Sequence, residues 1–359
     1  MPKEKVTIIS FYAIIAVIIT LGLIASLIIG KTYFALAGLG IVGLVLGLQH
    51  GVDADHISAI DNTTRKLLQE GKRPLTVGMW FSLGHSTLVV VLISALTIAT
   101  EQVAKAIPTF QTTGAAVGTL ASGAFLFLIG IVNVVVVLEV YKIFKGLRQG
   151  KLTEAECNDA LNKKGFLNTK IGKLFKIVEH PWQMYFVGLL FGLGFETASQ
   201  AALVALSVGL GVSSNVPMWM ILIVPVMFTA GMVLVDTSDG ISMRLAYGWA
   251  FLKPMRKIFY NLTLTIISVL VAFLVGGIEL IQVLSGEFGW TGVFWRILDN
   301  LNFETLGFGI VGIFIASWLV AMAYYKFKGF EKISFQKPTQ LSSVKTDTRN
   351  KSQPTNSSL

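Results

Sequence analysis

Four ionisable side chains stand close together in an otherwise apolar part of the chain. They are His50, Asp53, Asp55 and His56, and all lie within the apolar stretch 33–60. An ionised side chain at the bilayer centre costs at least about 2.5–3.5 kcal/mol, so these groups must face protein, water or an ion. Imidazole and carboxylate together are the ligands expected for Ni²⁺, Co²⁺ or Zn²⁺, whereas Ca²⁺ and Mg²⁺ prefer oxygen alone. The cluster therefore predicts a site for a divalent transition metal.

Helical spacing indicates which of the four residues could share one site. At about 100° per residue, His50, Asp53 and His56 fall within one third of the helix circumference. Asp55 points elsewhere if the helix is regular. We expect Asp55 either to orient an imidazole N–H or to join the site through a local break at Gly51. A polar network that locks helices together is the alternative to a metal site.

A third histidine and three carboxylates extend this pattern into later apolar stretches. His85 is the only ionisable residue for many positions in either direction, and we assign it to the same metal site. Glu196 and Asp236 lie within two further stretches and are the candidates for a translocation pathway. Asp239 is a third candidate, although its place near the end of a stretch allows solvation by water instead.

The composition explains why these residues are unusual. Of the 359 residues, 53% are hydrophobic and only 14% are charged, against about 25% charged in an average soluble domain. About 20 apolar residues are needed to cross a bilayer as a helix. We predict an all-α, polytopic membrane protein of about eight spans. The predicted spans are 6–30, 33–60, 75–99, 115–140, 183–212, 217–239, 258–283 and 304–325.

The distribution of charge predicts the orientation of these spans. The formal net charge is +9, and all but three of the 29 Lys and Arg residues fall in segments on one side. The exceptions are Lys31, Lys105 and Arg296. The positive-inside rule therefore places both termini in the cytoplasm and accounts for the basic charge without nucleic acid. Residues 1–332 form the transmembrane domain, with a cytoplasmic loop at 141–182, and 333–359 form a polar, disordered tail.

A faint internal repeat is also present. The echoes are Gly47-Leu48 with Gly192-Leu193, and Phe81-Ser82-x-Gly84 with Phe228-Thr229-x-Gly231. The matching spans would run in opposite directions, which is the relation found in transporters built from inverted repeats around a midplane site. We therefore consider an inverted repeat possible.

Several of these motifs resemble those of the nickel/cobalt transporter family, often called NiCoT. The hallmark His-x-x-x-x-Asp-His of its second span is met by His50, Asp55 and His56. The third-span and sixth-span motifs are met by Gly84-His85-Ser86 and by Gly231-Met232 followed by Asp236-Thr237-x-Asp239. The fifth-span motif departs, with Glu196 in place of Asp and Gln200 in place of Glu. The resemblance implies eight spans, cytoplasmic termini and transport of nickel or cobalt.

The function expected from these observations is uptake of nickel, cobalt or both by a secondary transporter in the cell membrane. Ni²⁺ or Co²⁺ is then the transported substrate rather than a cofactor, and we expect no enzyme activity. The chain contains no phosphate-binding loop, so ATP hydrolysis would need a separate subunit. No ATPase subunit is required if the membrane potential drives uptake. The alternatives are an exporter built on the same scaffold and an intramembrane metalloenzyme. The oligomeric state stays open.

Overall fold

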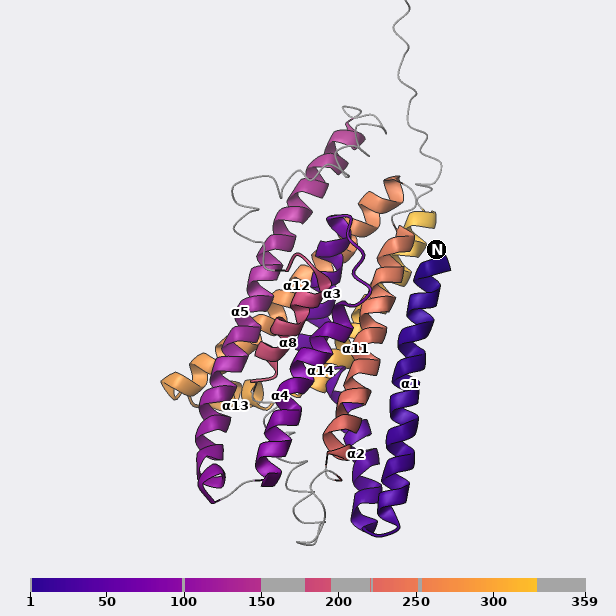
Figure 1. Cartoon of the computed structure of the whole chain (residues 1–359). Coiled ribbons are helices and arrows are strands. Elements are labelled where there is room, and N and C mark those ends of the chain that lie inside the picture. Colours follow the sequence, from indigo (N-terminus) through magenta and orange to yellow (C-terminus); the bar gives the residue numbers. More distant parts are fainter. Residues whose placement is uncertain are drawn as a thin grey trace, which may run out of the picture.

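The computed structural model describes residues 2–98, 101–149, 178–194, 222–250 and 254–327, together with residue 220. The predicted pathway residue Glu196 and the tail 333–359 lie outside these ranges. Every regular element within them is a helix, and the long helices stand side by side as a bundle (Figure 1). The elements are α1 (Pro2–Gly30), α2 (Phe34–His50), α3 (Ala54–Gln69), α4 (Val77–Ile98), α5 (Glu101–Arg148), η1 (Pro181–Gln183), α8 (Met184–Phe191), α11 (Ile223–Ala250), α12 (Pro254–Phe288), α13 (Val293–Asp299) and α14 (Phe303–Phe327).

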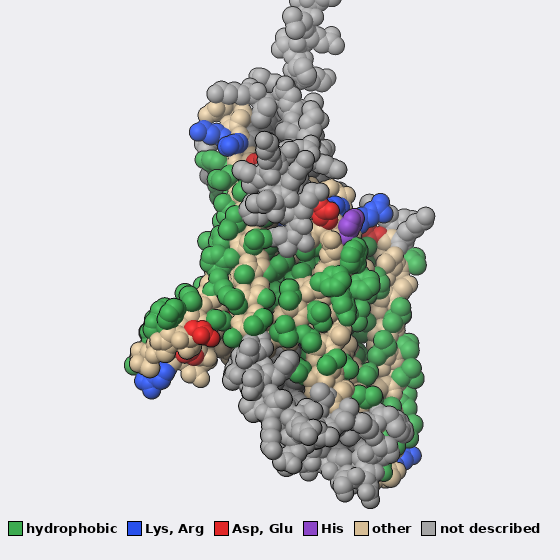
Figure 2. Space-filling model, turned by 60° about the vertical axis from the view of Figure 1, so that its left-hand side comes forward, with side chains coloured by type: hydrophobic (Ala, Val, Ile, Leu, Met, Phe, Trp, Pro, Cys, Tyr) green, Lys and Arg blue, Asp and Glu red, His purple; other side chains and the backbone are tan. Residues whose placement is uncertain are grey.

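The outer surface of this bundle is suited to lipid. The helices long and apolar enough to span a membrane are Glu4–Gly30, Ala116–Lys142, Ile223–Ala246, Leu262–Phe288 and Phe303–Tyr324, with shorter apolar segments at Gly38–His50 and Val77–Leu92. On the face shown in Figure 2, apolar side chains are spread across the middle of the molecule. Such a surface is stable in lipid, because there its apolar groups are not in contact with water. The predicted all-α, polytopic membrane fold is confirmed.

The second predicted span differs from the prediction, because it consists of two helices. α2 ends at His50, and α3 begins at Ala54 after three intervening residues. Asp53 takes an extended conformation with φ −56° and ψ 144°, which stops the α-helical hydrogen-bond ladder. The regular helix over 33–60 is therefore wrong, whereas the alternative of a local break at Gly51 agrees with the structure; α3 also runs on to Gln69, beyond the expected end.

The interrupted backbone is satisfied locally. The N–H of Val52 donates to the carbonyl of Gln49 over 2.9 Å, and the N–H of Asp53 donates to that of His50 over 3.1 Å. Such bonds over three residues use carbonyls that the end of an α-helix leaves without partners. The α14 backbone also packs on the break, because a Cβ at Gly307 would overlap the carbonyl oxygen of Val52. The break is thus a built feature of the bundle.

The C-terminal end of α8 has the same form as that of α2. Its last helical residue is Phe191, and residues 192–194 follow as turn and bend. The N–H of Leu193 donates to Leu190 over 3.2 Å, and the N–H of Gly194 donates to Phe191 over 2.8 Å. These bonds repeat the pattern at 51–53 residue for residue. Within the described residues, two different helices therefore end in the same way.

The packing of four helices repeats as well. α2 packs against α11 and α4 packs against α8, in both pairs through glycines that bring the two backbones together. The matched contacts are Gly47 with Phe228 and Gly188 with Phe81, Gly231 with Leu44 and Gly84 with Tyr185, and Gly51 with Val235 and Gly192 with Leu88. One constant shift in residue number relates α2 to α8, and another relates α4 to α11. A single symmetry operation therefore exchanges the two pairs.

The related helices run in opposite directions. α2 and α11 ascend in the view of Figure 1, whereas α4 and α8 descend. The contacts thus support the inverted repeat, but they change its register. The sequence echo paired Gly47 with Gly192, whereas the contacts pair Gly47 with Gly188, one helical turn earlier. We call α2–α5 the first half and α8–α12 the second half.

The half-helix α3 is held differently, by buried polar contacts. Residues 56–67 are buried throughout, although many are polar. Arg65 forms an ion pair with Asp61, to which Ser268 of α12 also donates a hydrogen bond. Asn133 of α5 donates to the side-chain oxygen of Asn62 over 2.8 Å. Because a buried polar group is costly without its partner, these contacts fix α3 against α5 and α12.

Candidate metal site

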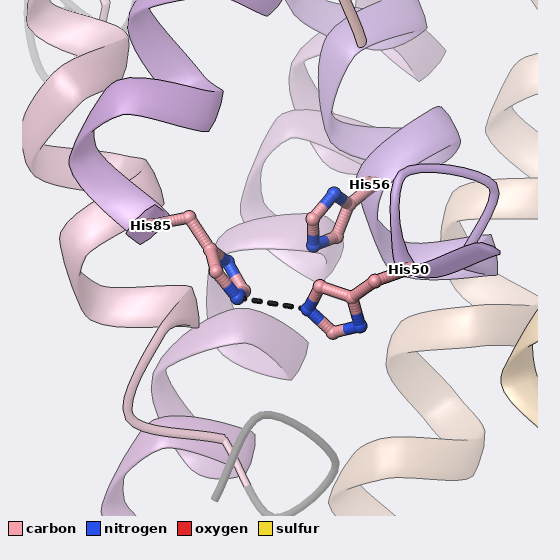
Figure 3. Close-up of side chains that lie close together, drawn as sticks. All are labelled: His50, His56 and His85. Carbon is pink, nitrogen blue, oxygen red and sulfur yellow. Dashed lines mark hydrogen bonds between the residues drawn. The ribbon is translucent and has the colours of Figure 1, made fainter. Parts of the chain in front are cut away.

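Three histidines from three helices meet inside the bundle. His50 is the last residue of α2, His56 lies in the first turn of α3, and His85 lies in α4. Each of the three residues is at most 1% exposed. The close-up in Figure 3 shows the three rings around one space, each with a ring nitrogen directed towards it. The break between α2 and α3 allows two of these rings, only six residues apart, to face one point.

The distances suit one bound cation. Nε2 of His50 and Nε2 of His85 lie 2.9 Å apart, and one nitrogen from each of the three rings lies within 4.8 Å of the others. Two nitrogens that bind an ion at about 2.0–2.1 Å and at right angles are about 3 Å apart. The three imidazoles are therefore placed to hold a divalent transition-metal ion with little rearrangement.

Aromatic rings complete the walls of this site. The ring centroid of Phe81 lies 4.8 Å from that of His56, edge to face. The Phe228 ring packs against His50 at 5.6 Å. Such rings exclude water, so a cation would exchange part of its hydration shell for the imidazoles. The surroundings therefore favour direct coordination of a dehydrated cation by the imidazoles over electrostatic attraction of a hydrated cation.

Two carboxylates lie close to the far nitrogens of two of these rings. Oδ2 of Asp53 lies 2.8 Å from Nδ1 of His50. Oδ1 of Asp236, on α11, lies 3.3 Å from Nδ1 of His56. Ser82 of α4 donates a hydrogen bond to the other oxygen of Asp236. A carboxylate on one ring nitrogen fixes the tautomer and leaves the other nitrogen for a metal.

The free edge of His56 agrees with this arrangement. Among the residues that the structure describes, Nε2 of His56 is buried without a hydrogen-bond partner. A buried polar atom normally has a partner, because leaving it unsatisfied costs about 1–3 kcal/mol. A metal ion would satisfy that nitrogen. The donor set is therefore consistent with a cation at the centre of the three rings.

The predicted carboxylate ligands take other positions. The group of side chains placed to share an ion consists of the three histidines, and neither Asp53 nor Asp55 belongs to it. Asp55 instead accepts a hydrogen bond of 2.9 Å from the backbone N–H of His56. That contact satisfies a first-turn N–H of α3, which has no partner within the helix. We expected Asp55 to orient an imidazole, but the carboxylates that lie beside imidazole nitrogens are those of Asp53 and Asp236.

The predicted pathway residues are placed in part. Asp236 is fully buried beside His56. Asp239 lies three residues further along α11. Glu196 lies outside the described residues. The two placed carboxylates therefore continue from the histidines along α11.

Some polar residues of this region were not anticipated from the sequence. Ser82 appeared only as part of a motif, although its position one turn before His85 places it beside the site. Asp61 and Arg65 fell in the segment 61–74, expected on the cytoplasmic side, but the structure buries both within α3. Their i, i+4 spacing is a signal for a helical ion pair and could have extended the predicted helix.

Comparison with known proteins gives a consistent answer. A family model described as high-affinity nickel-transport protein (NicO) matches residues 36–324. The nickel transporter NixA of Staphylococcus aureus is 40% identical over 92% of this chain and 97% of its own length. The nickel transporter NicT of Mycobacterium tuberculosis is 44% identical over 86% of this chain and 83% of its own length.

A relative named for another metal matches as well. The cobalt transport protein NhlF of Rhodococcus rhodochrous is 34% identical over 82% of this chain and 84% of its own length. No solved structure matches the chain. The resemblance seen in the sequence motifs is confirmed by these matches, which extend over nearly the whole helical bundle. The chain belongs to the NicO family of high-affinity nickel-transport proteins.

Proposed function

We propose that this protein is a secondary transporter that takes up nickel, cobalt or both across the cell membrane. The observation that carries the proposal is the convergence of His50, His56 and His85 at a helix break inside a membrane bundle. Interrupted helices near the midplane are where transporters commonly bind their ions. Because the relatives are named as transporters, we assign the site to transport rather than to catalysis.

The choice of metal follows from the ligands. Neutral imidazole suits nickel, cobalt and zinc, whereas magnesium and calcium prefer oxygen. Relatives carry the names of nickel and of cobalt transporters. Of the predicted ligands, the three histidines are the ones we place on the ion. Asp53 lies beside Nδ1 of His50, and Asp55 accepts the backbone N–H of His56, so neither is placed on the ion.

The membrane potential is sufficient to drive uptake. Moving a doubly charged ion inward through about 100 mV releases about 4.6 kcal/mol, which supports a concentration ratio of roughly a thousandfold. We therefore place no ATPase subunit in the mechanism. The positive-inside rule puts the start of α1 and the ends of α5 and α14 on the cytoplasmic side. These three points lie at one end of the bundle (Figure 1).

This orientation defines a direction along α11. The helix then ends towards the cytoplasm, so Asp239 lies closer to that side than Asp236. We place Glu196, Asp236 and Asp239 along the onward path of the ion from the histidines. Carboxylates lower the cost of moving a cation through a low-dielectric interior.

Uptake by purified protein in liposomes tests the proposal. Under an inside-negative potassium diffusion potential, we expect wild-type protein to accumulate labelled nickel or cobalt and the His50→Ala protein to accumulate neither. Competition between the two ions at limiting concentration ranks them. Absence of accumulation by correctly inserted wild-type protein contradicts the proposal, and net loss of metal from preloaded cells would instead indicate an exporter.

A further inference from the structure

Asp236 reaches the histidine site from the other half of the repeat. The three histidines belong to α2, α3 and α4 in the first half, whereas Asp236 belongs to α11 in the second. One of its oxygens faces Nδ1 of His56, and the other accepts the hydrogen bond from Ser82. Asp236 thus links α11, α3 and α4 at one point.

We infer that Asp236, held by Ser82, is a positioning residue that turns Nε2 of His56 towards the ion without binding the ion itself. The inference rests on the proposed function, because it assigns a role within the same site. It replaces the general pathway role predicted for Asp236 with a specific one, the contact of its carboxylate with His56. We call this contact the Ser82–Asp236–His56 relay.

Geometry excludes Asp236 as a ligand in this arrangement. Nδ1 and Nε2 lie on diverging edges of an imidazole ring, so a carboxylate on Nδ1 is separated from an ion on Nε2 by the ring itself. Carboxylate oxygens bind such ions at about 2.0–2.2 Å, a distance that Asp236 cannot reach while it contacts Nδ1. Both its oxygens are already engaged by His56 and Ser82.

The rival for this role is Asp55, which is next to His56 in the chain. Its carboxylate accepts the backbone N–H of His56 over 2.9 Å. A contact with the backbone does not select between the two ring nitrogens. The rotation and tautomer of the His56 ring therefore depend on Asp236, which contacts the ring directly.

The relay also joins two differently built parts of the bundle. α3 is fixed to α5 and α12 by polar side chains, whereas α11 packs on α2 and α4 through glycine backbones. His56 is carried by the first part, and Asp236 by the second. The affinity of the site for metal therefore depends on how α11 stands relative to α3.

Metal binding to purified protein tests the relay. In detergent, Asp236→Ala is expected to raise the Kd for Ni²⁺ by roughly 10- to 100-fold, the usual cost of removing a partner behind a metal ligand. Asp236→Asn keeps an acceptor for Nδ1–H and should fall between wild type and Ala. Ser82→Ala should shift the Kd in the same direction by a smaller factor, and Ser82→Thr should restore it.

Thr229→Val is the matched control on α11. The hydroxyl of Thr229 donates to the Pro225 carbonyl of its own helix over 2.8 Å, so its removal should leave the Kd unchanged. X-ray absorption of the nickel-loaded protein is the second measurement. We expect the same number of imidazole and oxygen ligands in wild type and in Asp236→Asn, because Asp236 does not bind the ion.

The outcomes separate the relay from the proposed function. Loss of one oxygen ligand in Asp236→Asn, or an unchanged Kd in Asp236→Asn and Asp236→Ala, overturns the relay even if wild type transports metal. If wild type binds nickel through three imidazoles but does not accumulate it, the transport proposal fails and the relay stands on the Kd values. Should Asp236→Ala not fold, Asp236→Asn decides.

Discussion

The C-terminal ends of α2 and α8 have the same backbone hydrogen bonds but carry different side chains. His50 precedes the break after α2, and Phe191 occupies the matching position before the break after α8. The glycine after each helix lies against a backbone carbonyl of another helix: Gly51 against that of Met232, and Gly192 against that of His85. Phe191 packs edge to face on Phe81 and Phe125, so its surroundings are apolar. Symmetry therefore accounts for where the two helices stop, while individual side chains distinguish the end that carries a histidine from the end that carries a phenylalanine.

The comparison also shows why glycine recurs on both sides. Association of helices in lipid depends on close packing, because lipid tails are as apolar as the helices themselves. Gly47 and Gly188 each let a carbonyl of the neighbouring helix approach to where a side chain would stand. The same backbone arrangement thus requires glycine in both halves, whatever the chemistry of the site.

Exchanging matched residues for leucine should have the largest effect. His85→Leu is expected to lower nickel uptake by more than roughly 100-fold, since even an outer partner of a metal ligand contributes about 10- to 100-fold. Met232→Leu at the matching position conserves volume in an apolar cluster and should change uptake little. Uptake assays at equal amounts of membrane protein measure both, and equal losses would contradict an asymmetric site.

Breaking the polar contacts of α3 should have the next largest effect, on stability. Arg65→Met leaves the Asp61 carboxylate buried without its cation and should lower the free energy of unfolding by about 3–5 kcal/mol. The double variant Asp61→Leu with Arg65→Met removes both charges and should recover part of this loss. Denaturation in detergent micelles gives the values, and a double variant weaker than Arg65→Met would refute this account.

Alanine at the matched glycines should have a smaller effect, equal in the two halves. Gly47→Ala and Gly188→Ala each force a Cβ onto a backbone carbonyl and should cost about 1–3 kcal/mol. Gly312→Ala on α14 is the control, because no neighbouring atom lies within 4 Å of the added Cβ. It should be neutral or stabilise by up to about 1 kcal/mol. A loss in one half only would argue against the repeat.

The sequence predicted the members of the site better than their roles. The cost of burying charge was enough to select His50, His56 and His85, and the structure brings their rings together. The helical-wheel argument, which grouped Asp53 with the histidines and placed Asp55 elsewhere, relied on a continuous helix, which the break near Gly51 removes. Whether the three histidines bind metal stays a prediction. The contact of His56 with Asp236 joins residues 180 apart, so local spacing could not reveal it.

The sequence by itself determined the membrane fold, its helical nature and the buried histidines, because apolar length and the cost of intramembrane charge are local properties. The motifs likewise identified the family. Only the tertiary structure decided that the second span breaks before Ala54 and that Gly47 matches Gly188. Those features depend on which backbones approach each other, and a glycine in the sequence does not say which neighbour it admits.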